Sequence, residues 1–252
     1  MVRIILSGCA GKMGSVITSC VSVRKDCTIV AGVDINTEKD CGFPVYSDIT
    51  SITEEADVII DFSHPSALSN ILSFSKTRNI PGVIATTGLN PDQIEQIKES
   101  ATETAIFFTF NFSLGVNLIA ELAKKAAAIL SEDFDIEIIE AHHNQKIDAP
   151  SGTALMLADA VTESLPNAYR YEYDRHSKRM KRERNEIGIH AIRGGTIVGE
   201  HEIIFAGRDE IIKISHSAMS KEIFAVGALN AALFVHDKEK GLYNMGDLVS
   251  SK

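Results

Sequence analysis

The sequence predicts an α/β fold, in which a doubly wound parallel sheet is joined to a second α+β region with a mixed or antiparallel sheet. In the first part of the chain, short apolar runs of strand length alternate with segments whose apolar residues have helical spacing. In the later part, strand-like runs follow one another across short glycine turns. These two patterns predict two differently built regions in a chain of 252 residues.

The first region begins with a strand over 2–7, and a helix follows it. The apolar positions of this helix recur at i, i+3, i+4, i+7 and i+8, so they share one face. They are Met13, Val16, Ile17, Cys20 and Val21. Strands that alternate with helices are typical of a parallel sheet covered on both faces. The other strands predicted here are 28–34, 56–63, 81–87 and 105–111.

The second region begins near Ser113, with a predicted helix over 115–130 and a strand over 134–140. The strands predicted in its later half are 187–192, 196–206 and 210–215. Two short turns, 193–195 and 207–209, are interpreted as hairpin connections rather than crossovers. The apolar, Ala-rich segment 223–235 then predicts a buried helix.

Composition and charge indicate a globular protein and exclude some partners. Hydrophobic residues make up 44% of the chain, and the net charge is −9. Because nucleic acids and anionic membranes are bound through a surplus of Lys and Arg, we expect neither as a partner. No long apolar run and no signal peptide precede the first glycine loop, so we expect a cytoplasmic protein. The four cysteines lie within the first 41 residues and lack a CxxC pair, which favours reduced thiols.

One segment departs from the acidic average, because seven Lys and Arg residues lie between Arg170 and Arg184. Few large apolar side chains accompany them, which favours a solvated, mobile loop. A basic flap that attracts an anionic substrate is the alternative, and charge alone does not separate the two.

A glycine-rich loop follows the first predicted strand and opens the first helix. Gly8, Gly11 and Gly14 form a GxxGxxG version of the dinucleotide-binding fingerprint, in which the backbone approaches a pyrophosphate at the helix N-terminus. Asp34 ends the second predicted strand 20 residues after Gly14, where a carboxylate can bind the adenosine ribose. A structural turn and a strand-end cap are the alternatives, but the strand-loop-helix context favours a nucleotide site.

A further strand end belongs to the same edge of the predicted sheet, where doubly wound folds bind their ligands. Thr86, Thr87 and Gly88 follow this strand and offer hydroxyl and backbone groups to the nicotinamide end of a cofactor. An ordinary polar turn is the alternative interpretation.

The segment 140–153 concentrates ionisable groups in one strand end and loop, with two histidines, a lysine and two carboxylates. It leads into a helix start marked by Pro150 and Ser151, where Gly152 and Thr153 would form an anion site. These groups suit the reduction of a carboxylate-bearing C=N or C=C system, in which an acid supplies the proton. A metal site is the other interpretation, but there is no HExxH pair or nearby cysteine cluster, so we expect no metal.

The segment from Glu140 to Ala154 closely resembles the signature of the dihydrodipicolinate reductase family. Further stretches carry the resemblance along nearly the whole chain: 8–14, 61–63, 85–88, 111–117, 192–195 and 198–201. The resemblance implies reduction of 4-hydroxy-tetrahydrodipicolinate to tetrahydrodipicolinate by NADH or NADPH, in lysine and diaminopimelate biosynthesis. It also implies a Rossmann-like dinucleotide-binding domain (1–112, completed by 218–252), a substrate-binding and oligomerisation domain (113–217), and a homotetramer.

Carried over residue by residue, the resemblance makes His142 a proton donor or substrate-polarising group and Lys146 the second acid. His143, Gly152 and Thr153 become substrate-binding. By the same carry-over, the residues along the cofactor would be Gly8, Lys12, Met13, Asp34, Thr86, Gly88 and Phe110. The glycine loop and the strand end described above add Gly11, Gly14 and Thr87. The chain departs from the family pattern at Lys12, where Arg is common, and at Ser177 and Thr196.

Two other functions are alternatives. Another small two-domain Rossmann dehydrogenase would not explain the segment 142–153, and an inactive nucleotide-binding sensor should have lost Lys146 or the histidines. For the cofactor, Asp34 predicts that NADH is used at least as well as NADPH, because its carboxylate would repel a 2′-phosphate. Lys12 and Lys39 could reach that phosphate and permit dual use.

Overall fold

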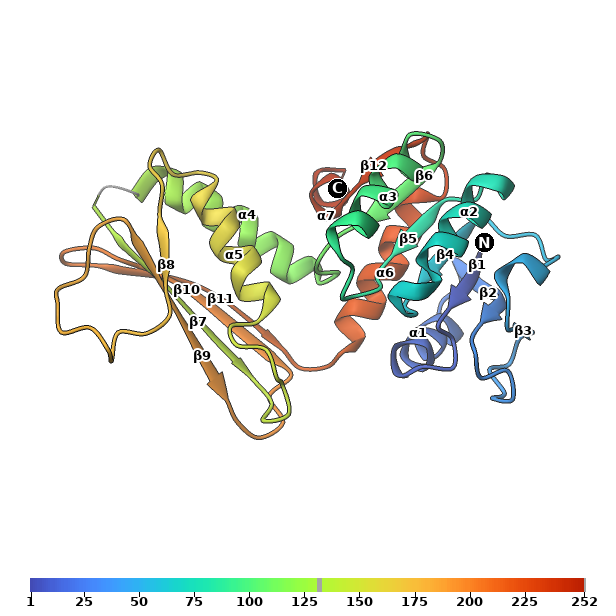
Figure 1. The fold of residues 1–252 in the computed structure, drawn as a ribbon, viewed down its shortest axis with the longest axis horizontal. Helices are drawn as coiled ribbons and strands as arrows, with labels where there is room; N and C mark the ends of the chain where they lie inside the picture. The colour runs from blue at the N-terminus through green and yellow to red at the C-terminus, as the bar shows by residue number, and fades with distance from the viewer. Residues whose placement is uncertain (131–132, 252) are drawn as a thin grey trace. The chain divides into compact units, whose positions relative to one another are not determined.

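A computed structural model describes residues 1–130 and 133–251 (Figure 1). Tertiary contacts divide the chain into two compact units. The first unit combines Met1–Leu114 with Lys221–Lys252, and the second is Gly115–Ser220. The chain therefore leaves the first unit for its middle section and returns to it with its last segment.

Within the described residues, the first unit is built on a seven-stranded sheet with the strand order β12-β6-β5-β4-β1-β2-β3. All of its pairings are parallel, so the prediction of a doubly wound parallel sheet is confirmed. The strands are β1 (Val2–Ser7), β2 (Cys27–Val33), β3 (Val45–Tyr46), β4 (Val58–Asp61), β5 (Gly82–Ile84), β6 (Ala105–Phe108) and β12 (Gly241–Tyr243).

Helices cover both faces of this sheet, and alternate strand residues enter two cores. On β1, Ile4 and Leu6 pack with α1 and α6 on one face, whereas Ile5 packs with α2 and α3 on the other. Burial on both faces explains why the strands appear in the sequence as continuous apolar runs. The helices of this unit are α1 (Lys12–Ser22), α2 (Leu68–Arg78), α3 (Pro91–Ala101), α6 (Glu222–Val235) and α7 (Met245–Ser250), with short 3₁₀ turns η1 (Ile49–Ser51) and η2 (Pro65–Ala67).

The strand order reverses at β1, which lies between β4 and β2. The loops that follow β1 and β4 therefore lead away to opposite faces of the sheet. In doubly wound sheets, this reversal opens a crevice at the carboxyl ends of the strands, where ligands bind. The glycine loop follows β1 and so lies at this position.

The second unit has, among the described residues, a five-stranded mixed sheet with the order β11-β10-β7-β9-β8. The central strand β7 (Asp135–His142) pairs parallel with β9 (Glu186–Arg193) and antiparallel with β10 (Gly199–Ala206). Helices α4 (Leu114–Leu130) and α5 (Gly152–Thr162) run side by side and cover one face of this sheet (Figure 1). The remaining strands are β8 (Arg170–Glu172) and β11 (Ile211–Ala218).

One of the two predicted hairpins is wrong. The turn at 193–195 does not join neighbouring strands, because β7 lies between β9 and β10. The turn instead crosses the end of β7, where the Gly194 N–H donates to the carbonyl oxygen of His142 (2.9 Å) and Asn144 N–H donates to that of Gly195 (3.2 Å). The hairpin predicted at 207–209 is confirmed, since β10 and β11 pair antiparallel.

The basic residues of the segment 170–184 form ion pairs within the second unit. The Arg182 guanidinium donates to Glu137 (3.0 Å) and to the backbone carbonyl oxygen of Ile136 (3.0 Å). Three further pairs are Arg170–Glu186, Arg175–Glu186 and Lys178–Glu172. Much of the positive charge of this segment is therefore neutralised locally, which counts against its interpretation as a basic flap.

Candidate active site

The glycine loop is tightly packed between β1, α1 and the end of β4. Gly8 has a φ of +79°, and a Cβ atom there would lie 2.5 Å from the carbonyl oxygen of Phe62. A Cβ atom at Gly14 would overlap with the carbonyl oxygen of Gly8. At Gly11 the constraint is milder, because a Cβ atom would lie 3.2 Å from that same oxygen. Gly8 and Gly14 are thus required by the shape of the loop itself.

Helix α1 begins at Lys12 with Gly11 as its N-cap residue, and within the described chain no side chain caps this helix start. The first N–H groups of a helix lack intrahelical partners and lie at the positive end of the helix dipole. The helix start can therefore bind an anion, and the exposed Lys12 adds a positive charge next to it.

Two charged side chains connect the loop after β2 to the glycine loop. The Asp34 carboxylate accepts from the N–H of Ala10 (3.0 Å) and from that of Asn36 (3.0 Å). The Lys39 ammonium donates to the carbonyl oxygen of Ala10 (2.8 Å) and to the Ser15 hydroxyl (2.8 Å). A tight glycine turn, an uncapped helix start and a fixed carboxylate fit the pyrophosphate and ribose of a dinucleotide.

A buried carboxylate lies at the end of β4. Asp61 is fully buried and accepts from the hydroxyls of Ser63 (2.6 Å) and Thr86 (2.7 Å). Burial raises the pKa of Asp61, although these hydrogen bonds oppose the rise. The Thr86 hydroxyl is therefore directed at Asp61, while Thr87 and Gly88 beyond it are exposed.

The last two cofactor candidates differ in exposure. Met13 is partly buried and packs against the core between α1 and the sheet. Phe110 is 75% exposed, and its ring stands edge-on to Phe108 with a centroid distance of 5.3 Å. A large exposed aromatic ring is available for contact with a ligand.

In the second unit, the core face of the sheet becomes polar at the end of β7. Ile138 enters the core, and the next two residues of β7 on that face are Glu140 and His142. Strand pairing places His201 of β10 opposite Glu140, and Arg193 of β9 opposite His142. Residues far apart in the sequence are thereby gathered at one end of the sheet.

Glu140 is the centre of this polar cluster and is fully buried. One carboxylate oxygen contacts His142 Nδ1 (2.6 Å) and Arg193 Nη1 (2.8 Å), and the other accepts from Arg193 Nη2 (2.7 Å) and Ser151 N (3.0 Å). Burial alone would raise the pKa of Glu140, but the hydrogen bonds from Arg193, His142 and Ser151 hold it below its usual range. Glu140 is therefore ionised at neutral pH.

His201 adds a neutral imidazole to the cluster. The residue is 5% exposed, its ring lies edge-on to that of His142 at 5.3 Å, and its Nε2 atom is 3.2 Å from the Ser151 hydroxyl. Burial, and then the neighbouring His142, lower the pKa of His201 to about 4. Within residues 1–130 and 133–251, its Nδ1 atom has no hydrogen-bond partner.

The loop after β7 carries a lysine and leads to the start of α5. The Lys146 ammonium pairs with Asp148 (2.9 Å), and this pairing lowers the pKa of the Asp148 carboxyl. Ser151 caps α5 by accepting from Ala154 N–H, and a Cβ atom at Gly152 would meet open space. The substrate candidates His143 and Thr153 are partly buried in the same segment.

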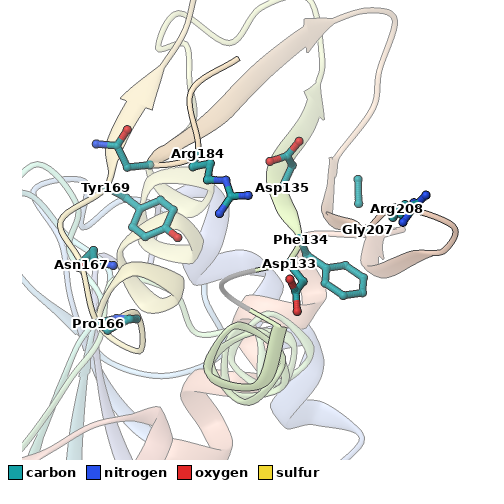
Figure 2. Close-up of a pocket in the computed structure, with 11 residues that line it drawn as sticks. Asp133, Phe134, Asp135, Pro166, Asn167, Tyr169, Arg184, Gly207 and Arg208 are labelled. Carbon is teal, nitrogen blue, oxygen red and sulfur yellow. The ribbon is translucent and has the colours of Figure 1, made fainter. Parts of the chain in front are cut away.

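A cavity of about 570 Å³ lies at the other end of this sheet (Figure 2). It is lined by residues where β7 begins and β10 ends, among them Asp135 and Ala206, and by Tyr169 and Arg184. His142 ends β7, seven residues beyond Asp135, which corresponds to roughly 23 Å along a strand. This cavity is therefore separate from the Glu140 cluster.

Comparisons with known proteins identify the family. The model of the dihydrodipicolinate reductase N-terminus matches residues 2–112, and that of its C-terminus matches residues 115–249. The chain belongs to the dihydrodipicolinate reductase family. A 4-hydroxy-tetrahydrodipicolinate reductase from Caldanaerobacter subterraneus is 53% identical, with 99% of this chain and 98% of the relative covered. One from Clostridium novyi is 48% identical over 100% of both chains.

Solved structures agree with the family assignment. A dipicolinate-bound dihydrodipicolinate reductase from Paenisporosarcina has a TM-score of 0.81 and 27% identity, and 97% of each chain is covered. A myo-inositol dehydrogenase from Corynebacterium glutamicum, at 18% identity and a TM-score of 0.62, shares the fold. Membership of a reductase family makes the chain an oxidoreductase, and the predicted family is confirmed.

Several residues of the cluster had no role in the sequence analysis. Glu140, Arg193 and His201 lie in stretches that carry the family resemblance, but their mutual contacts depend on the order of β10, β7 and β9. Nothing in their spacing indicates these contacts. The hydroxyl of Thr86, a residue expected at the nicotinamide end of the cofactor, donates to Asp61.

Proposed function

We propose that the chain reduces 4-hydroxy-tetrahydrodipicolinate to tetrahydrodipicolinate with NADH or NADPH, as a step in lysine and diaminopimelate biosynthesis. The observation that carries the proposal is the cluster at the end of β7. There the His142 imidazole is hydrogen-bonded to the buried Glu140 carboxylate. The same segment of this family member also carries Lys146 and a helix start with open space beside it. The 53% identical relative bears the name of this reductase.

The first unit would hold the cofactor. The pyrophosphate would lie on the N-terminus of α1 beside Gly8, Gly11, Lys12, Met13 and Gly14, and Asp34 would bind the ribose. The backbone around Thr86, together with Thr87, Gly88 and Phe110, would border its nicotinamide end. When bound, the nicotinamide supplies the hydride.

The second unit would supply the proton and bind the carboxylates of the substrate. The 4-hydroxyl group of the substrate must leave as water, which gives an unsaturated cyclic imine. Hydride addition to this imine builds negative charge on the ring, and a positioned acid must neutralise it with a proton. His142 and Lys146 are the candidates for this role, and the positive charge of Lys146 would also stabilise the ring as that charge develops.

A planar dicarboxylate has two anionic groups to place. His143, and the α5 start at Gly152 and Thr153, would bind a substrate carboxylate, because the helix start presents N–H groups and the open space at Gly152 admits an oxygen. The dipicolinate bound to the Paenisporosarcina relative is a ligand of this shape and charge.

We further propose a homotetramer in the cytoplasm, assembled through the second unit. The face of its sheet opposite α4 and α5 carries Ile192 and Ile211, which are 51% and 63% exposed. Exposed apolar side chains on a sheet face favour burial against another subunit. Light scattering coupled to size-exclusion chromatography would test this, and a monomeric mass would contradict it.

Coupled turnover tests the reaction itself. Pyruvate and aspartate semialdehyde are condensed enzymatically, the purified chain is added, and the absorbance of NADH or NADPH is followed. We expect the absorbance to fall only when the condensation product and the chain are both present. If neither cofactor were consumed, the proposed reaction would be wrong.

A further inference from the structure

We propose that Glu140 is a positioning residue, which fixes the proton of His142 on Nδ1 and so leaves Nε2 as the nitrogen that exchanges a proton with the substrate. The kinetic consequence rests on the proposed function. The assignment of the proton rests only on the contacts around Glu140.

The first step concerns the hydrogen bonds that Glu140 can make. An ionised carboxylate has no proton to donate, so every group that hydrogen-bonds to it must be a donor. Three of its four contacts come from obligatory donors, namely the two Arg193 nitrogens and the Ser151 N–H. The fourth is His142 Nδ1 at 2.6 Å, which must therefore carry its proton.

The second step concerns the other ring nitrogen. Because Nδ1 donates its proton to Glu140, only Nε2 is left to gain or lose a proton. Nε2 carries a hydrogen in the charged ring and a lone pair in the neutral ring. Gly199 of β10 flanks this atom, and a Cβ atom there would lie 3.2 Å from Nε2. Because Gly199 has no side chain, no Cβ atom occupies this position beside Nε2, while His201 packs edge-on to the ring.

The third step concerns the elements that Glu140 joins. Its carboxylate binds the end of β7 through His142, the end of β9 through Arg193, and the start of α5 through Ser151. The same group therefore positions the proton donor and the helix start that would bind a substrate carboxylate. Arg193 balances the buried charge, without which the carboxylate would tend to take up a proton and lose this function.

Glu140→Gln is the informative substitution because it preserves volume but offers only one acceptor oxygen. If that oxygen stays with Arg193 Nη2 and Ser151 N–H, the amide –NH₂ faces His142 Nδ1. An –NH₂ group can only donate, so His142 would have to carry its proton on Nε2 instead, and Arg193 Nη1, which bonds the same Glu140 oxygen, would lose its acceptor. The variant should thus exchange the tautomer without removing any catalytic group.

Glu137→Gln is the matched control. Glu137 lies on the same strand, on the other face, and contacts an arginine and a histidine as Glu140 does: Arg182 at 3.0 Å and His190 at 2.8 Å. It is outside the proposed site. Glu140→Asp, which keeps the charge but shortens the side chain, serves as the conservative variant.

The experiment combines ¹⁵N NMR of the His142 ring with steady-state kinetics, and a His142→Gln sample assigns the signals. We expect neutral His142 to be protonated on Nδ1 in the wild type and in Glu137→Gln, and on Nε2 in Glu140→Gln. We expect kcat of Glu140→Gln to fall at least about tenfold, with an unchanged NADH dissociation constant, and Glu140→Asp to retain more activity.

The wild-type spectrum decides the proposal even if Glu140→Gln does not fold. Neutral wild-type His142 protonated on Nε2 would overturn it, as would a Glu140→Gln kcat equal to that of Glu137→Gln. If the wild type consumed neither NADH nor NADPH with the substrate, the proposed function would fail. The NMR result would still test the positioning of His142 separately.

Discussion

The Lys39 ammonium donates to the carbonyl oxygen of Ala10 at 2.8 Å, and this bond ties the loop after β2 to the glycine loop. Asp34 binds the N–H of the same residue at 3.0 Å. A cation and a carboxylate therefore lie together where the adenosine ribose of a dinucleotide would bind. Their opposite charges should determine the choice between NADH and NADPH.

We expect NADH to be used at least as well as NADPH, because Asp34 would repel a 2′-phosphate. Asp34→Ala should raise the ratio of kcat/KM for NADPH to that for NADH, and Lys39→Met should lower it. The measurement is the pair of kcat/KM values for the wild type and both variants. A tenfold preference of the wild type for NADPH would contradict the role given to Asp34.

Gly14 and Gly11 should respond differently to substitution. Gly14→Ala forces a methyl group into backbone atoms of Gly8 and Cys9, so we expect a loss of at least about 1–3 kcal/mol in the free energy of unfolding. Gly11→Ala needs only a small shift, so it should stay folded but bind NADH more weakly. Urea unfolding and NADH titration test both variants, and equal stability of the two would argue against the packing described here.

His142→Ala and Lys146→Ala should each lower kcat by about 10²- to 10⁴-fold, the usual contribution of general acid catalysis. The NADH dissociation constant should hardly change, because neither residue belongs to the glycine loop. Single-turnover rates and NADH titrations separate the two effects. Wild-type rates in both variants would show that His142 and Lys146 do not take part in catalysis.

Pyridine-2,6-dicarboxylate should inhibit competitively with substrate, with one carboxylate at the start of α5. Thr153→Val should weaken this inhibition by about 1–3 kcal/mol, because a buried anionic partner would lose a hydrogen-bond donor. Inhibition constants for the wild type and the variant give the answer. An unchanged constant would place the carboxylate elsewhere.

His201 should make stability depend on pH. Its pKa of about 4 in the folded chain lies below the ordinary 6.5, so the unfolded chain takes up this proton first. The contribution of His201 to the free energy of unfolding is complete above pH 6.5 and is lost as the pH falls towards 4. The total loss is about 3 kcal/mol, since one pKa unit corresponds to about 1.4 kcal/mol. His201→Asn should flatten the pH dependence of urea unfolding in this window, and an unchanged slope would count against the buried neutral imidazole.

Local patterns were enough to predict much of the first unit. The strand over 2–7 has the predicted limits, and the other predicted strands differ mainly in length. Two-sided burial makes such strands continuous apolar runs, which are readily detected. The edge strands β3 and β12, of two and three residues, were not predicted because so short a run shows no periodicity.

The ion pairs of the basic segment 170–184 depend in part on carboxylates that lie outside it in the sequence. Its composition favoured a solvated loop, yet Arg182 contacts Glu137, which is 45 residues away in the sequence. Composition describes the charge a segment carries and not the carboxylates that the fold brings to it. The ion pairs therefore became visible only in the folded unit.

By itself, the sequence determined the α/β class, the glycine loop with Asp34, and the segment that carries His142, Lys146 and the start of α5. These features are local, since a turn, a strand end or a helix start is encoded by neighbouring residues. Only the tertiary structure decided that β7 lies between β9 and β10, and hence that Arg193, His201 and Ser151 surround Glu140. Strand order and register arise from pairing between residues that are 51 to 71 positions apart in the chain, and the spacing within any one segment carries no record of that pairing.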